Sequence, residues 1–323
     1  MIKEATSPLE PQYEDLGGSG AGRKARRLFL ATRPKFLTAS VLPVLVGTAW
    51  GSAVAGHFDL TVALLALVAT ALVHGASNVL NDVGDEISGS DRANLDRIYP
   101  YTGGSRFIQN RIMSVAEMNR WGLGLLALAS VFGLWLTVLK GPLVLAFGVA
   151  GIAIAVLYSL PRVQLSGRGL GELCICISFG LLPVCGAAWL QSDIIDGTSV
   201  LVALPTGLWV TLILLINSVP DCRADGDSGK RTMVVRLGAD GARRLYQLLH
   251  AAAFGCLLTL SLIGAMPWWV AVGGAIVLLG GLRASSGIGS EFSRPVLTRS
   301  IEMTLGLQAA GSVLLIVGSL FAA

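Results

Sequence analysis

Two short acidic segments contain the side chains of this chain that are best suited to chemistry. Each places one amide ahead of two carboxylates at helical spacing: Asn78, Asp82 and Asp85 in the first, and Asn217, Asp221 and Asp225 in the second. Residues three or four positions apart share one face of a helix, so each segment is expected to present these groups in one direction. The matching order predicts that the two segments face each other across one cavity.

The surroundings of these segments indicate a magnesium site. The stretch before the first segment, residues 60–80, carries no formal charge. Carboxylates at the edge of so apolar a region are costly and are normally paired, hydrated or bound to metal. Mg²⁺ prefers oxygen ligands, keeps several waters, and is usually held by one or two carboxylates together with substrate phosphates. We therefore expect Mg²⁺ and a phosphate ester at this site.

Basic residues follow both acidic segments: Arg97 and Arg106 after the first, and Lys230 and Arg231 after the second. A metal ion with Arg and Lys beside it can neutralise a departing diphosphate. In an apolar chain this favours an allylic isoprenoid diphosphate, whose tail would lie among the hydrophobic helices. Ionisation of its C–O bond leaves a carbocation for an electron-rich acceptor, and apolar helices would keep water out.

The elements that position these groups are predicted to be membrane helices. The 323 residues are 53% hydrophobic and only 14% charged, whereas soluble domains carry about 25% charged residues. A transmembrane helix needs about 20 mostly apolar residues. Nine spans are expected, at 36–56, 61–81, 118–139, 142–160, 170–190, 200–219, 245–265, 267–283 and 300–321. We predict an all-α membrane protein in which a nine-helix bundle, within residues 33–323, surrounds a central cavity, while residues 1–32 form a flexible tail.

The basic residues predict how the chain is oriented in the membrane. Of the 24 Lys and Arg residues, only Lys140 falls in a connection on the opposite side from the N-terminal tail. Because cytoplasmic loops are enriched in Lys and Arg, the N-terminus and both acidic segments should be cytoplasmic, and the C-terminus should lie outside. The net charge of +4 then reflects membrane topology and not nucleic-acid binding. The expected location is the cytoplasmic (inner) membrane, with the active site at its cytoplasmic face.

Four stretches carry a resemblance to a known family: RPKFLTASVLPVLVGTA (33–49), NVLNDVGDEISGSD (78–91), YSLPRVQLSGRGLGEL (158–173) and NSVPDCRADGDSGKRTMVVRLG (217–238). In these stretches the chain resembles the UbiA superfamily of intramembrane prenyltransferases. The GSD and GKRT…RLG runs are most similar to its menaquinone branch, which prenylates 1,4-dihydroxy-2-naphthoate. The resemblance implies a helical bundle around a cavity that opens to the membrane.

The resemblance also implies roles for individual residues. The metal would be bound by Asp82, Asp85, Asp221 and Asp225. Substrate binding would fall to Asn78, Asn81, Asp91, Arg97, Arg106, Asn217 and Lys230, with Tyr158 and Arg162 on the acceptor side. The expected partners are a polyprenyl diphosphate, an aromatic acceptor and the lipid bilayer.

The chain departs from the menaquinone branch beside its second acidic segment. Pro220 stands where that branch usually has Arg, and Ser218 replaces its paired Asn. Because of these changes, the alternative hypothesis is a prenyltransferase that acts on another acceptor, such as 4-hydroxybenzoate or homogentisate. A separate hypothesis concerns His74, one turn before Asn78, which could accept a proton or orient the cluster, although a membrane histidine bonded to nearby backbone is the more common case.

Two interpretations from other classes compete with the enzyme. An ion- or proton-coupled secondary transporter would also need intramembrane acids, but such sites usually lie near the bilayer midplane in broken helices. A lipid- or quinone-binding scaffold would leave the acids beside Lys230 and Arg106 without a role.

Overall fold

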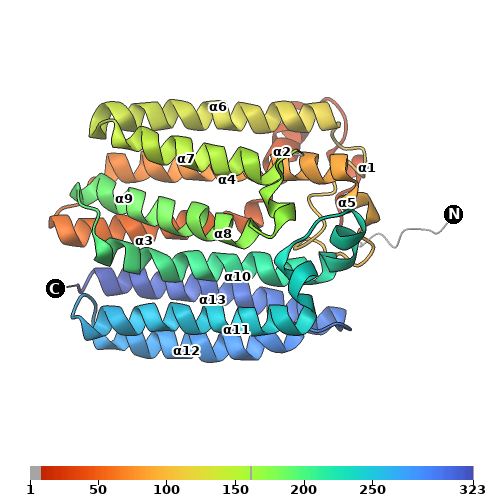
Figure 1. Ribbon diagram of the computed structural model, residues 1–323. Coiled ribbons are helices and arrows are strands. Elements are labelled where there is room, and N and C mark those ends of the chain that lie inside the picture. The colour runs from red at the N-terminus through yellow and green to blue at the C-terminus, as the bar shows by residue number, and fades with distance from the viewer. Residues whose placement is uncertain (1–8, 161, 323) are drawn as a thin grey trace.

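The computed structural model describes residues 9–160 and 162–322, and in these residues helices are the only regular secondary structure. The long helices run side by side as a bundle (Figure 1). They are α3 (Thr38–Ala55), α4 (Leu60–Ser88), α6 (Val115–Lys140), α7 (Leu143–Ser159), α9 (Leu182–Ser192), α10 (Gly197–Asp227), α11 (Met233–Leu262), α12 (Trp268–Ala284) and α13 (Arg294–Ser319). The short helices are α1 (Tyr13–Leu16), α2 (Ala21–Ala31), α5 (Ser90–Ala93) and α8 (Gly171–Cys176). A π-helical turn at Ile177–Leu181 joins α8 to α9, so that the three pieces form one long span, Gly171–Ser192.

The all-helical membrane architecture predicted from composition is confirmed. Within the described ranges, eight helices are long and apolar enough to cross a bilayer. The remaining expected span, 142–160, corresponds to α7, an apolar helix of 17 residues, whereas the eight candidate spans are 20 to 31 residues long. The count of nine spans stays a prediction.

Both acidic segments are helical, as their spacing predicted, and the two helices continue beyond the expected ends of their spans at residues 81 and 219. Helix α4 continues past residue 81 and ends only at Gly89, which adopts a left-handed conformation with φ of 80°. Helix α10 likewise continues through Pro220 to Asp227. The polar residues of both segments are therefore held in register by the last turns of rigid helices, at the same end of the bundle.

Residues 9–32 were expected to be part of a flexible tail, but they form α1 and α2 and pack against the bundle. Leu16 is buried beside Ile112 and Met113. The Trp121 indole Nε1 donates to the carbonyl oxygen of Leu28 at 3.0 Å. The apolar contacts and this bond are made with residues about 100 positions away, which no local sequence pattern indicates. The rest of the predicted tail, residues 1–8, lies outside the described ranges.

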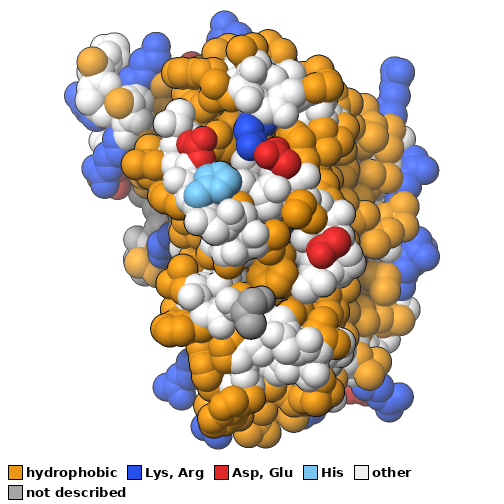
Figure 2. All heavy atoms as spheres, turned by 90° about the vertical axis from the view of Figure 1, so that its left-hand side faces the viewer, with side chains coloured by type: hydrophobic (Ala, Val, Ile, Leu, Met, Phe, Trp, Pro, Cys, Tyr) orange, Lys and Arg blue, Asp and Glu red, His pale blue; other side chains and the backbone are white. Residues whose placement is uncertain are grey.

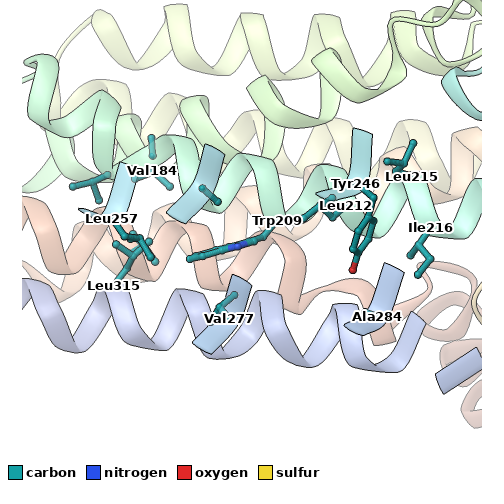
Figure 3. Packing of buried hydrophobic residues seen from close by; sticks show 14 of the residues in the cluster. Val184, Trp209, Leu212, Leu215, Ile216, Tyr246, Leu257, Val277, Ala284 and Leu315 are labelled. Atoms are coloured by element: carbon teal, nitrogen blue, oxygen red, sulfur yellow. The ribbon is translucent and has the colours of Figure 1, made fainter. Parts of the chain in front are cut away.

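The largest core cluster lies where α10 to α13 pack on α3 and α9. Trp209 and Tyr246 are buried there among aliphatic side chains (Figure 3). Helix α3 approaches α9 closely, because a Cβ on Gly51 would lie 2.2 Å from the carbonyl oxygen of Ala188. This packed half holds α10 rigidly, and α10 in turn carries the second acidic segment.

The two ends of the bundle differ in charge. The acidic segments, α1 and α5 lie at one end, and α13 finishes at the other (Figure 1). Figure 2 looks onto that second end, where hydrophobic and neutral side chains predominate around a few charged ones. Lys140, the basic residue predicted to stand apart, pairs there with Asp193 at 3.1 Å.

Candidate active site

Lys230 joins the two acidic helix ends. Its ammonium Nζ lies 2.6 Å from Asp85 Oδ1 on α4 and 3.3 Å from Asp225 Oδ1 on α10. The lysine lies three residues after the last residue of α10, Asp227, and is only 8% exposed. The two segments therefore meet as the matching spacing predicted, with one buried cation between them.

The connection between α4 and α6 folds over the acids and supplies hydrogen bonds from its backbone and side chains. The Asn94 amide Nδ2 donates to Asp221 Oδ1 at 2.6 Å. The backbone N–H of Ser105 donates to Asp82 Oδ2 at 3.0 Å. A cation from the N-terminal side of the chain, Arg33, lies with its Nη1 3.9 Å from Asp82 Oδ1.

A polar chamber of about 140 Å³ lies between these elements. Its walls include eight residues that the sequence predicted for the site: Asn81, Asp85, Asp91, Tyr158, Asn217, Asp221, Asp225 and Lys230. Arg33, Thr102 and Glu172 also line it. Asp82 does not, because it is covered by the Gly103–Gly104 turn and is only 3% exposed.

The donor set fits a hard cation such as Mg²⁺. Three buried oxygens that can only accept, Asp82 Oδ1, Asp91 Oδ2 and Asn217 Oδ1, have no hydrogen-bond partner in the structure. Among the described residues no three acidic, histidine or cysteine side chains already form a compact metal cage. That arrangement suits an ion held through waters and substrate phosphates as well as carboxylates.

Burial and mutual repulsion act on the acids outside the spans. The pKa of Asp91 is raised well above its usual value, first by burial and then by the charges of Asp85, Asp82 and Asp221. For Lys230, burial lowers the pKa, but the carboxylates of Asp85 and Asp225 outweigh it, and the net shift is upward. Lys230 therefore stays positively charged, and a further cation beside Asp91 would relieve the repulsion.

Some predicted residues lie outside the polar chamber. Arg97 is buried against Glu10, with Nε 2.9 Å from Oε1, and also donates to the carbonyl oxygen of Asn94. Arg106 is buried and donates through Nη1 to the Asp91 carbonyl oxygen at 2.7 Å. Arg162 is exposed to solvent. Arg97 and Arg106 thus shape the loop that covers the acids, and Arg162 lies apart.

Sequence reasoning missed several residues of the site. Arg33 lies within the first stretch that carried the family resemblance, but a single arginine ahead of a span indicates only topology. Asn94, the partner of Asp221, gives no spacing signal because 127 residues separate the two. Glu172, which no spacing pattern links to the acidic segments, also lines the polar chamber.

The polar chamber continues into apolar space. A second cavity of about 190 Å³ shares Arg33, Asn81, Tyr158 and Asn217 with it and reaches His74 and Phe179. A third cavity of about 360 Å³ shares Thr70, Val73, Gly151 and Ser178 with the second and extends between α4, α6, α7 and α9. Neighbouring spaces therefore lead from the acids into the apolar interior of the bundle. Asn78 lines the second cavity, and its amide donates to the Thr32 carbonyl oxygen.

The covering turn gives a prediction about Gly104. It has φ of +74°, and a Cβ there would lie 2.5 Å from Asp91 Oδ2 and 3.0 Å from Asp82 Oδ1. We expect Gly104→Ala to displace both carboxylates and to lower activity about 100-fold, as misplacement by about 1 Å can. Gly124→Ala on α6 is the matched control, because nothing lies within 4 Å of its Cβ position. Equal turnover of the two purified variants would contradict this role.

The Arg97–Glu10 pair gives a prediction about stability. Both side chains are at most 4% exposed. We expect Arg97→Leu to reduce the free energy of unfolding by about 3–5 kcal/mol, because Glu10 is left buried without a partner. The double variant Glu10→Leu/Arg97→Leu should recover most of that loss in denaturant unfolding of the detergent-solubilised protein. A double variant no more stable than Arg97→Leu would show that the pair does not hold the N-terminal segment.

Comparison with known proteins places this site in a family context. The model of the UbiA prenyltransferase family matches residues 40–291. The 1,4-dihydroxy-2-naphthoate octaprenyltransferase of Mycobacterium tuberculosis is 36% identical over 290 residues, covering 87% of this chain and 94% of the relative. The Escherichia coli protein of the same name is 34% identical over 247 residues, covering 73% and 77%.

The solved structures agree at the level of the fold. A UbiA homolog from Archaeoglobus fulgidus bound to DMAPP and Mg²⁺ superposes with a TM-score of 0.64 at 16% identity, covering 90% of this chain and 99% of that one. A UbiA homolog from Aeropyrum pernix K1 superposes with a TM-score of 0.62 at 19% identity, covering 86% and 96%.

Proposed function

The chain belongs to the UbiA prenyltransferase family, and we propose that it transfers a polyprenyl group from an allylic isoprenoid diphosphate to 1,4-dihydroxy-2-naphthoate, with Mg²⁺ as cofactor. This proposal rests on one observation: two acidic helix ends meet at a buried lysine, and apolar cavities lead away from that point. A diphosphate and its hydrocarbon tail need these two environments side by side.

The donor's diphosphate would lie in the polar chamber. Asp82, Asp85, Asp221 and Asp225 would hold the metal, which when bound neutralises diphosphate charge and assists the leaving group. Lys230 and Arg33 lie at the polar chamber and would contact diphosphate oxygens directly. Asn94 keeps Asp221 oriented through its hydrogen bond. The Archaeoglobus fulgidus homolog, which has the same fold, is bound to DMAPP and Mg²⁺, and this supports a prenyl diphosphate and a divalent metal as ligands.

The tail would occupy the third cavity, away from water, and would pass along one side of the second cavity to reach the diphosphate. With the diphosphate held at the helix ends, the allylic carbon comes to the boundary between the polar chamber and the second cavity. Breaking of its C–O bond leaves a carbocation there, and the apolar walls keep water from capturing it. The ring carbon of the acceptor that bears the carboxylate then forms the new C–C bond, and the carboxylate leaves as carbon dioxide.

We propose that the protein lies in the cytoplasmic membrane of its cell, with residues 33–323 as the membrane domain and the acids at the cytoplasmic face. The bundle end that carries the acids also carries the basic connections, in agreement with the enrichment of Lys and Arg on cytoplasmic loops. The position of the acids at helix ends, and not midway along the bundle, also favours the enzyme over a transporter.

The test of this function is the mass of the product. Purified protein in lipid would be incubated with Mg²⁺, geranylgeranyl diphosphate or a longer donor, and 1,4-dihydroxy-2-naphthoate, 4-hydroxybenzoate or homogentisate. We expect a prenylated, decarboxylated naphthoquinol that disappears when Mg²⁺ is chelated. If product forms only with another acceptor, prenyl transfer is retained and the proposed acceptor is wrong. If no product forms with any acceptor, the proposal is overturned.

A further inference from the structure

His74 has a defined hydrogen-bonding state that the metal site does not explain. Its Nδ1 lies 2.9 Å from the hydroxyl Oγ of Ser40, and that hydroxyl donates its own proton to the carbonyl oxygen of Leu37 at 3.0 Å. A serine hydroxyl has one proton, and while Ser40 donates it to Leu37 it can only accept from Nδ1. In this arrangement the neutral imidazole carries its proton on Nδ1, and Nε2 presents a lone pair.

The His74 ring that carries this lone pair lies at the wall of the second cavity. His74 and Ser40 both line this space, and no described side chain is hydrogen-bonded to Nε2. Phe179 holds the imidazole edge to face at 4.8 Å between ring centroids. The histidine is thus fixed by neighbours on two sides and offers one hydrogen-bond acceptor.

The rest of the second cavity suits a flat aromatic molecule. Phe36, Ile213 and Phe179 supply apolar surface, while Asn78 and Tyr158 add polar groups nearer to the acids. Among the residues that line it, Arg33 is the only one that carries a full charge. An aromatic ring bearing a hydroxyl group would find apolar walls and one acceptor for its proton.

The position along α4 fits the proposed reaction. His74, Asn78 and Asp82 follow one another at intervals of four residues and so lie on one face of the helix. Eight residues of helix span about 12 Å. An aromatic ring lying between His74 and the metal-binding acids would have one edge at the histidine and the other beside the allylic carbon.

We propose that His74 Nε2 binds a hydroxyl group of the aromatic acceptor and thereby sets which ring carbon faces the allylic carbon. This inference rests on the proposed function and assigns the acceptor subsite within it. Ser40 is a positioning residue, because its hydroxyl fixes the imidazole tautomer and orientation.

Equilibrium binding with altered ligands tests the assignment. Affinity for 1,4-dihydroxy-2-naphthoate and for its two monodeoxy analogues would be measured with Mg²⁺ and an unreactive prenyl thiodiphosphate present. In the wild type, removal of one of the two hydroxyls should weaken binding about 10- to 100-fold, as expected for a lost buried hydrogen bond. The variant His74→Leu should bind the parent and that analogue equally, whereas His74→Gln, whose amide oxygen can accept, should restore part of the difference.

Two controls separate this role from a structural one. Affinity of His74→Leu for the thiodiphosphate should equal that of the wild type. His250→Leu replaces another buried histidine, on α11 away from the cavities, and should keep the full discrimination between ligands. If His74→Leu discriminates as the wild type does, or loses donor affinity as well, the inference is wrong while the proposed function stands. Failure of the wild type to bind any of the aromatic ligands would overturn both.

Discussion

Replacing Asp82 by asparagine is expected to lower kcat at least about 100-fold, by analogy with removal of one charged or polar group that stabilises a transition state. The new amide would keep an oxygen for the Ser105 N–H but would lose the negative charge that the metal requires. The Asp82 side chain is 3% exposed, and its Oδ1 has no hydrogen-bond partner, although the Arg33 guanidinium lies 3.9 Å from it. The measurement is the rate of Mg²⁺-dependent product formation.

The control for Asp82→Asn is the same substitution at Asp240, which lies exposed on α11. Both variants should fold and insert, which a thermal unfolding scan in detergent would verify. Turnover by Asp82→Asn within a few fold of that by Asp240→Asn would contradict a metal-binding role for the first acidic segment.

Replacing Lys230 by methionine is expected to have the second largest effect, and to act on both stability and activity. Without the ammonium, the partly buried carboxylates of Asp85 and Asp225, 16% and 12% exposed, are left unneutralised, which should cost about 3 kcal/mol of unfolding free energy in the absence of Mg²⁺. Because a bound cation replaces part of the missing charge, Mg²⁺ should stabilise this variant more than it stabilises the wild type. Activity should fall about 100-fold through loss of a diphosphate contact.

Lys140→Met is the matched control for Lys230→Met, since Lys140 pairs with Asp193 at the opposite end of the bundle. Mg²⁺ should shift its unfolding midpoint by the same amount as that of the wild type. If Mg²⁺ stabilises Lys230→Met no more than the control, the lysine does not compensate the charge of the acids.

The helices could largely be predicted from hydropathy, and their ends could not. Apolar runs located the long helices, because bilayer thickness fixes how long such a run must be. Hydropathy ended these two spans too early, at residues 81 and 219, because it no longer indicates a helix where charged residues begin. The helical spacing of the acidic segments did indicate that α4 and α10 extend further, and they end at Ser88 and Asp227. Helix α7 was placed correctly but is only 17 residues long.

The acids of the site could be predicted, and most of their partners could not. Spacing on a helix is local, so Asn78, Asp82 and Asp85 could be placed on one face from sequence. The pairing of Arg97 with Glu10, 87 residues apart, depends on how α1 packs against the connection between α4 and α6. An arginine near an acidic motif therefore predicts a cation in that region, and the three-dimensional packing decides which carboxylate it meets.

Donor binding tests most directly whether the two acidic helix ends form one site for a metal and a diphosphate. Affinity for geranylgeranyl thiodiphosphate would be measured at a series of Mg²⁺ concentrations for the wild type, Asp82→Asn, Asp221→Asn and the double variant. We predict Mg²⁺-dependent binding in the wild type, a large loss in each single variant, and little further loss in the double variant, because residues that act as one unit are not additive. Binding that does not depend on Mg²⁺, or losses that simply add, would contradict a single shared site.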